Sequence, residues 1–173
     1  MAWITKPAGI TMINGIHHVS LTTHNLDRMV RFYCDVLGFE VALRAEWQDS
    51  ELMDRMIGLQ GSAARVAILK TGNSYLEIFE YQSPVARSDD HSRAPNRAGY
   101  THICLDVSDA EAEYQRLLAT GMKFTCPPPR FEIGVQATYG HDPDGNIIEF
   151  QQTIGDKSGV LLSDLPLLAD PRP

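Results

Sequence analysis

The stretch Gly15-Ile-His-His-Val-Ser-Leu-Thr-Thr-His-Asn25 has a counterpart in the second half of the chain, Gly99-Tyr-Thr-His-Ile-Cys-Leu-Asp-Val-Ser-Asp109. In each stretch a histidine, His18 or His102, lies in a short strand-like run. Seven positions later each stretch reaches an Asn or Asp that can cap a helix. The repeat indicates that one structural unit occurs twice and that the two histidines hold corresponding positions.

The resemblance between the two halves continues after the histidines. Each half runs through a helical stretch that ends at a glycine, Gly38 or Gly121. Each half then closes on an apolar strand that carries a glutamate, Glu77 in the first half and Glu149 in the second. A His and Glu pair is therefore expected to occur twice.

This pattern predicts an α+β fold of two tandem β-α-β-β-β modules, at residues 13–82 and 99–153. The modules are expected to form one structural domain and one cleft-shaped, barrel-like mixed sheet. The segment between them is rich in Pro, Ser, Asp and Arg, which is typical of a connection. Residues 154–173 are predicted to be a C-terminal extension whose leucines pack against this subunit or a partner's.

Composition excludes several classes of function. The chain has 173 residues with 15 Lys and Arg against 22 Asp and Glu, and its formal charge of -7 argues against a nucleic-acid partner. The odd, scattered cysteines Cys34, Cys104 and Cys126 indicate a reducing compartment. Neither a signal peptide nor an apolar run long enough to cross a bilayer is evident. We therefore expect a cytoplasmic protein without a membrane partner.

Strand alternation predicts which side chains share a face. If the two modules curl toward each other, His18 and Glu77 form one wall of a cleft, and His102 and Glu149 form the other. Two imidazoles and two carboxylates suit a divalent ion such as Zn, Ni, Co, Mn or Fe(II). A buried glutamate between apolar neighbours also needs a partner, which a metal would supply.

Other assignments remain open at this point. A single strand histidine more often packs in a core than binds a metal. His17 is the rival to His18, although its face carries Val19 and Leu21, which should pack on the helix. Glu80, near the end of its strand, is expected in solvent. The side chains with the parity or place to line a substrate cavity are Tyr75, Phe79, Tyr100, Tyr139 and Gln151. Arg130, next to the proline run, is expected to meet either an anionic substrate or solvent.

The chain resembles the vicinal oxygen chelate superfamily, the group of glyoxalases, bleomycin-resistance proteins and extradiol dioxygenases. The matching segments are residues 18–39, 75–79, 99–107 and 142–150. They include a helix ending Phe-Tyr-x-x-x-Leu-Gly and the ending Asp-Pro-x-Gly-x-x-x-Glu. Together they span most of the molecule.

The resemblance implies a divalent metal held by His18, Glu77, His102 and Glu149, and a small-molecule substrate. It also implies a homodimer. It favours a glyoxalase-like lyase or isomerase that moves a proton next to a carbonyl, through an enediolate or enolate, in a small 2-oxo compound or acyl thioester. Glu149 or Glu77 would be the catalytic base. Thr22 stands where bacterial glyoxalase I tends to carry an arginine for glutathione, so glutathione is not indicated as the substrate.

Two alternatives follow from the same resemblance. An Fe(II) extradiol dioxygenase uses two His and one Glu, and would need His18, His102 and Glu149 without Glu77. A metal-free protein of the bleomycin-resistance type would sequester a ligand instead. The presence of His or Glu at all four positions favours the lyase or isomerase.

Overall fold

The structure is a computed structural model that describes residues 15–87 and 94–155. The two β-α-β-β-β modules are both present, and the predicted α+β class is confirmed. Their sheets are open and separate, with four strands in the first and five in the second. The leucines expected to pack in the C-terminal extension lie outside the described residues.

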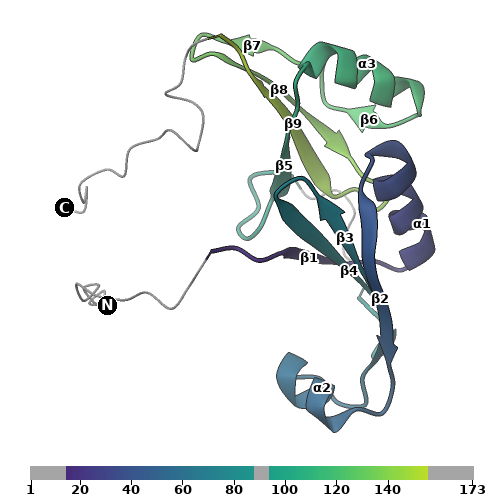
Figure 1. Ribbon diagram of the computed structural model, residues 1–173. Helices are drawn as coiled ribbons and strands as arrows, with labels where there is room; N and C mark the ends of the chain where they lie inside the picture. Colours follow the sequence, from purple (N-terminus) through teal and green to yellow (C-terminus); the bar gives the residue numbers. More distant parts are fainter. Residues whose placement is uncertain (1–14, 88–93, 156–173) are drawn as a thin grey trace, which may run out of the picture.

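The first module forms a sheet with strand order β1-β4-β3-β2, in which β1 runs parallel to β4 (Figure 1). A helix follows β1, and a second, short helix joins β2 to β3. The elements are β1 (Val19–Thr22), α1 (Leu26–Arg31), η1 (Phe32–Val36), β2 (Glu40–Trp47), α2 (Glu51–Ile57), β3 (Ala63–Thr71) and β4 (Ser74–Ser83).

The second module repeats this plan with strand order β5-β9-β8-β6, and β5 runs parallel to β9. A short strand, β7, pairs with β8 beside this path. The elements are β5 (His102–Asp106), α3 (Ala110–Ala119), β6 (Lys123–Phe124), β7 (Arg130–Phe131), β8 (Val135–His141) and β9 (Ile147–Thr153).

The helix boundaries follow the predicted capping signals. The side chain of Asn25 accepts a hydrogen bond from the Arg28 backbone N–H, and that of Asp109 accepts one from Ala112. The first helix departs from a regular α-helix, because a π-helical turn, η1, replaces its last turns. Gly38 follows this turn with a φ of 77°, a conformation that favours glycine.

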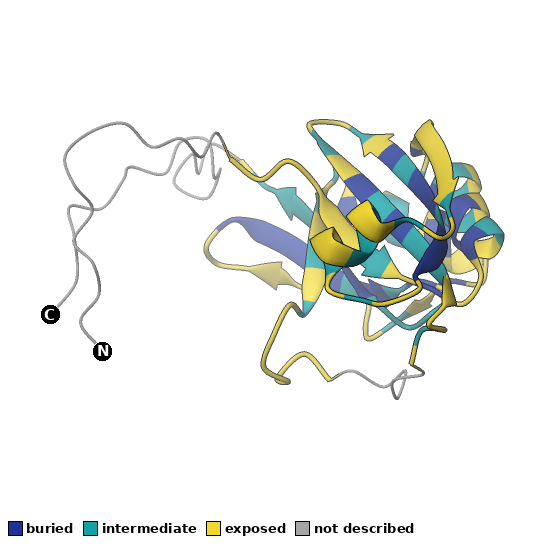
Figure 2. Ribbon diagram, turned by 90° about the horizontal axis from the view of Figure 1, so that it is seen from below, coloured by how far each residue is buried: buried dark blue, intermediate teal, exposed yellow. Residues whose placement is uncertain are grey.

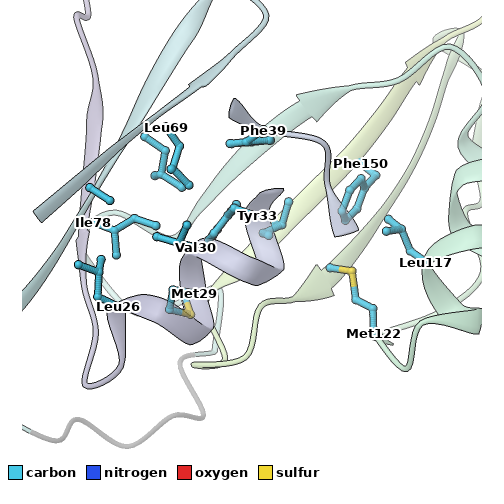
Figure 3. Packing of buried hydrophobic residues seen from close by; sticks show 13 residues of the cluster. Leu26, Met29, Val30, Tyr33, Phe39, Leu69, Ile78, Leu117, Met122 and Phe150 are labelled. Atoms are coloured by element: carbon cyan, nitrogen blue, oxygen red, sulfur yellow. The ribbon is translucent and has the colours of Figure 1, made fainter. Parts of the chain in front are cut away.

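The helix α1 and its π-turn lie between the two modules and join their cores (Figure 3). On one side Leu26 and Val30 pack with Leu69 and Ile78 of the first sheet, and on the other side Leu117, Met122 and Phe150 belong to the second module. All of these side chains are nearly inaccessible to solvent. The burial of this much apolar surface in one cluster couples the two modules.

A polar clasp reinforces this core at the turn between β8 and β9. Asp142 is only 5% exposed and accepts a hydrogen bond of 3.0 Å from the hydroxyl of Tyr33 in η1. Its neighbour Asp144 accepts from Thr23 and pairs with Arg28. The Asp-Pro-Asp-Gly turn of residues 142–145 therefore connects the second module to the first through hydrogen bonds and an ion pair.

Burial raises the pKa of the Asp142 carboxyl, and hydrogen bonds from Asn146, Tyr33 and the Asp144 backbone offset part of the rise. The folded protein thus binds this proton more tightly than the unfolded chain. The contribution of Asp142 to stability is largest below its unfolded pKa of 3.8 and is lost as the pH rises through the folded pKa.

Buried segments gather in the strands and in the helix turns that face them, whereas the connections are exposed (Figure 2). The helix α2 stands apart from the shared core and has no buried residue (Figure 1). None of the helices within residues 15–87 and 94–155 has the length and apolar character to cross a membrane.

Replacement of Tyr33 by Phe tests the clasp. The variant leaves the buried carboxylate of Asp142 with one donor fewer, so we expect it to lower the free energy of unfolding by about 1–3 kcal/mol. The loss should be larger at pH 7 than at about pH 4, because the hydroxyl favours the ionised carboxylate. Urea unfolding at both pH values measures the effect. Tyr114→Phe is the control, because the ring of this α3 tyrosine contacts Phe124 and stays in place; it should change little.

Candidate metal centre

Each predicted histidine lies beside its predicted glutamate. His18 Nε2 is 3.3 Å from Glu77 Oε2, and His102 Nε2 is 3.1 Å from Glu149 Oε2. All four side chains are partly exposed, and each glutamate retains 18% of its side-chain surface. The two pairs therefore have nearly the same His to Glu distance, and their two carboxylates are equally accessible to solvent.

Strand register explains why the pairs are equivalent. Ser20 is the Cα partner of Glu77 across the parallel β1 and β4, and Cys104 is the partner of Glu149 across β5 and β9. In both modules the histidine lies two positions before that partner: His102 is the first residue of β5, and His18 directly precedes β1. Parallel pairing therefore brings the histidine of one strand to the glutamate of the next, once in each module.

The other ring nitrogen of each histidine also has a partner. His18 Nδ1 is 2.8 Å from His17 Nδ1, and His102 Nδ1 is 2.9 Å from the hydroxyl oxygen of Thr101. In both modules the partner is the residue directly before the histidine. His17 is exposed and stacks on Tyr75. Of the two residues expected to pack on the helix, Leu21 packs against the core, whereas Val19 is 41% exposed.

The two pairs do not meet within one chain. Across residues 15–87 and 94–155 no group of three or more His, Cys, Asp or Glu side chains is close enough to hold a metal ion. The reason lies in the shared core, which buries Leu76 and Ile78 of β4 together with Ile148 and Phe150 of β9. Because strand faces alternate, the His and Glu side chains lie on the sheet faces turned away from that core. Within the described residues the two pairs are therefore separate, and the four-ligand set stays a prediction.

The surroundings of the two glutamates differ. On the Glu77 face of the first sheet Trp47, Phe79 and Tyr81 form an aromatic cluster, with ring centroids 5.7 to 6.1 Å apart. On the face of Glu149 the ring of Tyr139 lies 5.1 Å from that of His102. Burial raises the pKa of Tyr81, with help from the charge of Glu77, and likewise that of Tyr139, with help from Glu149. Both phenols thus stay neutral beside a carboxylate.

Cys104 contacts Glu149 directly. Its thiol donates a hydrogen bond to the carboxylate, and burial together with the Glu149 charge raises the pKa of the thiol to about 12. Cys104 lies two positions after His102 on β5 and opposite Glu149 on β9, which places the thiol beside the carboxylate. At neutral pH the group is therefore a neutral thiol and a poor nucleophile.

The remaining candidates from the sequence are scattered around the two faces. Phe79 belongs to the aromatic cluster, and Tyr100 is fully exposed. Arg130 donates to Gln136, and Gln151 is half-buried on the Glu149 face. Glu80, expected in solvent, accepts hydrogen bonds from the Leu26 backbone and from Arg65, so it holds the start of α1 instead.

Sequence reasoning considered His17 only as a rival to His18, and it missed Thr101, Trp47 and the contact of Cys104 with Glu149. His17 and Thr101 directly precede His18 and His102 in the sequence. That position does not by itself predict a hydrogen bond to Nδ1, which depends on how the side chains are oriented.

Comparison with known proteins identifies the family. The profile of the Glyoxalase/Bleomycin resistance protein/Dioxygenase superfamily matches residues 15–150, and the chain belongs to this family. A glyoxalase family protein from Bacillus cereus has the same fold, with a TM-score of 0.76 over 84% of this chain and 97% of that one, at 22% identity.

Two curated relatives are enzymes. The chain is 35% identical over 116 residues to a 2-epi-5-epi-valiolone epimerase from Actinomyces sp., a match of 62% of this chain and 61% of that protein. It is 26% identical over 146 residues to the lactoylglutathione lyase of Haemophilus influenzae, covering 84% of this chain and 97% of that one. The relatives thus include an epimerase and a lyase.

Alkylation of Cys104 tests the environment of Glu149. A rise in the pKa from 9.0 to about 12 lowers the thiolate fraction at neutral pH about 1,000-fold, so iodoacetamide should label this cysteine very slowly. Glu149→Gln removes the neighbouring charge and should speed the labelling, which peptide mass spectrometry measures in chelator-treated protein. Glu77→Gln, on the other sheet, is the matched control. Equal labelling in all three proteins would show that Glu149 does not govern this thiol.

Proposed function

We propose that this protein is a divalent-metal-dependent lyase or isomerase that moves a proton next to a carbonyl group of a small 2-oxo compound or acyl thioester. The observation that carries the proposal is the pair of equivalent His and Glu sites, with Nε2 to Oε2 distances of 3.3 and 3.1 Å. The epimerase and lyase among the relatives support the same class of reaction.

The donor set fits a divalent ion of borderline character. His18, Glu77, His102 and Glu149 would hold it, with nitrogen and oxygen donors that suit Zn, Ni, Co, Mn or Fe(II). In each pair the imidazole nitrogen and the carboxylate oxygen already lie at a separation that two ligands of one ion can share. When bound, such an ion polarises the substrate carbonyl and makes the adjacent C–H more acidic.

The chain's own groups would carry the proton. Glu77 and Glu149 are the carboxylates beside the site, and either can accept the proton at an Oε atom and return it. The aromatic cluster of Trp47, Phe79 and Tyr81 would exclude water from one side of the substrate. The neutral hydroxyl of Tyr139 is a hydrogen-bond donor for a substrate oxygen on the other side.

We further propose that the complete site forms between two copies of the chain. The strands β1 and β5 are both at the edge of their sheets, so each His and Glu pair is beside an open edge. Large apolar side chains are exposed there, with Ile16 at 84%, Tyr100 fully exposed and Val19 at 41%. A homodimer that places the first module of one copy against the second module of the other would cover these side chains. It would also unite the two pairs.

Metal titration tests the ligand set. Purified protein should bind about one divalent ion per chain, and Glu77→Gln should weaken that affinity by more than about 100-fold, because a charged ligand becomes a neutral amide. Competition with a chelator measures the affinity, and Glu40→Gln, at an exposed glutamate of β2, is the matched control. The same variants are then assayed for exchange of the substrate C–H with deuterium from solvent, using 2-oxoaldehyde thiol adducts and acyl thioesters.

A different result would select another function. If Glu77→Gln keeps its metal and the protein consumes oxygen with catechols, the three-ligand dioxygenase is correct. Failure of the protein to bind any of the five metals would contradict the proposal.

Mixing of two inactive variants tests the shared site. His18→Ala disables every site that uses the first module of its chain, and His102→Ala disables every site that uses the second. If the site lies between copies, a mixed dimer contains one intact site. Free exchange of subunits should then restore about a quarter of the wild-type activity. Co-expression followed by the exchange assay measures the recovery, and each variant alone is the control. No recovery in mixtures shown by mass spectrometry to contain mixed dimers would place each site within one chain.

A further inference from the structure

The two histidines of the proposed metal site share a feature on the side away from the glutamates. His17 Nδ1 lies 2.8 Å from His18 Nδ1, and the hydroxyl of Thr101 lies 2.9 Å from His102 Nδ1. The residue directly before each histidine is therefore its hydrogen-bond partner. The two partners differ in type, but an imidazole and a hydroxyl have one property in common, because each can either donate or accept a hydrogen bond.

This property matters because the histidines need opposite partners in two states. Without a metal, the ring proton of each histidine is most stable on Nε2, because Nε2 can then donate a hydrogen bond to the glutamate that it faces. The Nε2 to Oε2 distances of 3.3 and 3.1 Å allow this bond. The ring's Nδ1 is then an acceptor and needs a donor. With a metal on Nε2, the single ring proton must be on Nδ1, which then needs an acceptor.

We propose that His17 and Thr101 are reversible positioning residues for His18 and His102, an inference that rests on the metal site proposed above. Each donates to Nδ1 when its histidine is free and accepts from Nδ1 when the histidine is a ligand. In this exchange every ring keeps one proton, which moves between the two nitrogens of that ring through water. The His17 proton moves from Nδ1 to Nε2 and the His18 proton moves from Nε2 to Nδ1, so no net proton is taken up or released.

The surroundings hold these partners in place. The ring of His17 lies edge-on to that of His18, with centroids 5.1 Å apart, and stacks on Tyr75 at 6.1 Å. Tyr75 is two positions before Glu77 on β4, so the strand that supplies the carboxylate also supports His17. A threonine hydroxyl reverses its role by rotation, whereas a neutral imidazole must change its tautomer. His17 is therefore the partner whose state reports the exchange.

Nitrogen NMR of the imidazole rings tests the proposal on the full chain. At about pH 8, long-range proton to nitrogen correlations identify which ring nitrogen of each neutral histidine carries the proton. Without metal, we expect the proton on Nδ1 of His17 and on Nε2 of His18 and His102. With saturating Zn²⁺, we expect it on Nε2 of His17 and on Nδ1 of the other two. A purely structural role for His17 would leave its tautomer unchanged.

Matched variants separate the hydrogen bond from the bulk of the side chain. His17→Leu and Thr101→Val remove the partner, and each should weaken Zn²⁺ binding by about 10- to 100-fold. His17→Asn and Thr101→Ser keep a group that can turn between donor and acceptor. Their Zn²⁺ affinities should stay within about threefold of wild type. Circular dichroism checks that all four variants are folded.

Three outcomes would overturn the proposal. The first is a His17 tautomer that is the same with and without bound Zn²⁺. The second is a His17→Leu variant that binds Zn²⁺ as tightly as wild type, and the third is a His17→Leu variant that binds it as weakly as His18→Ala. The weak result would make His17 itself a ligand.

Failure of the metal site is recognised separately. If wild-type protein binds no Zn²⁺, the proposed function fails, while the tautomers in metal-free protein still show whether His17 donates to His18. A metal-free His18 with its proton on Nδ1 would contradict the hydrogen-bond arrangement itself.

Discussion

The helix α1 and its π-turn lie between two sheets, and the rest of the arrangement depends on this packing. Its apolar side chains complete the core of the first module and, through Tyr33, reach the second. Because each sheet buries the face toward this helix, the opposite faces must be the ones that carry the His and Glu pairs. The same packing that joins the cores of the two modules therefore keeps the two pairs apart in the part of the chain that the structure describes.

The duplicated site follows from strand register more than from any single residue. A parallel pair of strands places a histidine beside a glutamate on the next strand, and the duplication repeats the arrangement. What differs between the copies is the environment. Glu77 lies near an aromatic cluster, whereas Glu149 accepts from a thiol whose own pKa the carboxylate helps to raise. Two carboxylates in unlike surroundings can take unlike roles in proton transfer, even when both are ligands.

The helix-capping residues could be predicted from the sequence because a cap depends only on the residues next to it. Asn25 and Asp109 cap their helices as expected, since a side-chain oxygen next to free backbone N–H groups is stabilising in any context. The π-turn and the clasp were not predictable. By sequence alone, residues 142–145 indicate only a hairpin connection. The hydrogen bond from Tyr33 to Asp142 joins residues more than 100 positions apart, so it forms only when the two modules pack together. Glu80 was misjudged for the same reason, because its partners belong to other elements.

The sequence by itself determined the two modules, their fold class and the equivalence of His18 and Glu77 with His102 and Glu149, because periodicity and duplication are properties of the chain alone. Only the tertiary structure decided that each histidine meets its own glutamate at about 3 Å, that His17 and Thr101 contact the far ring nitrogens, and that the two pairs lie apart. The physical reason is that alternation along a strand determines which side chains share a face of the sheet. Whether that face points toward solvent or toward another element depends on how the sheet packs on the core.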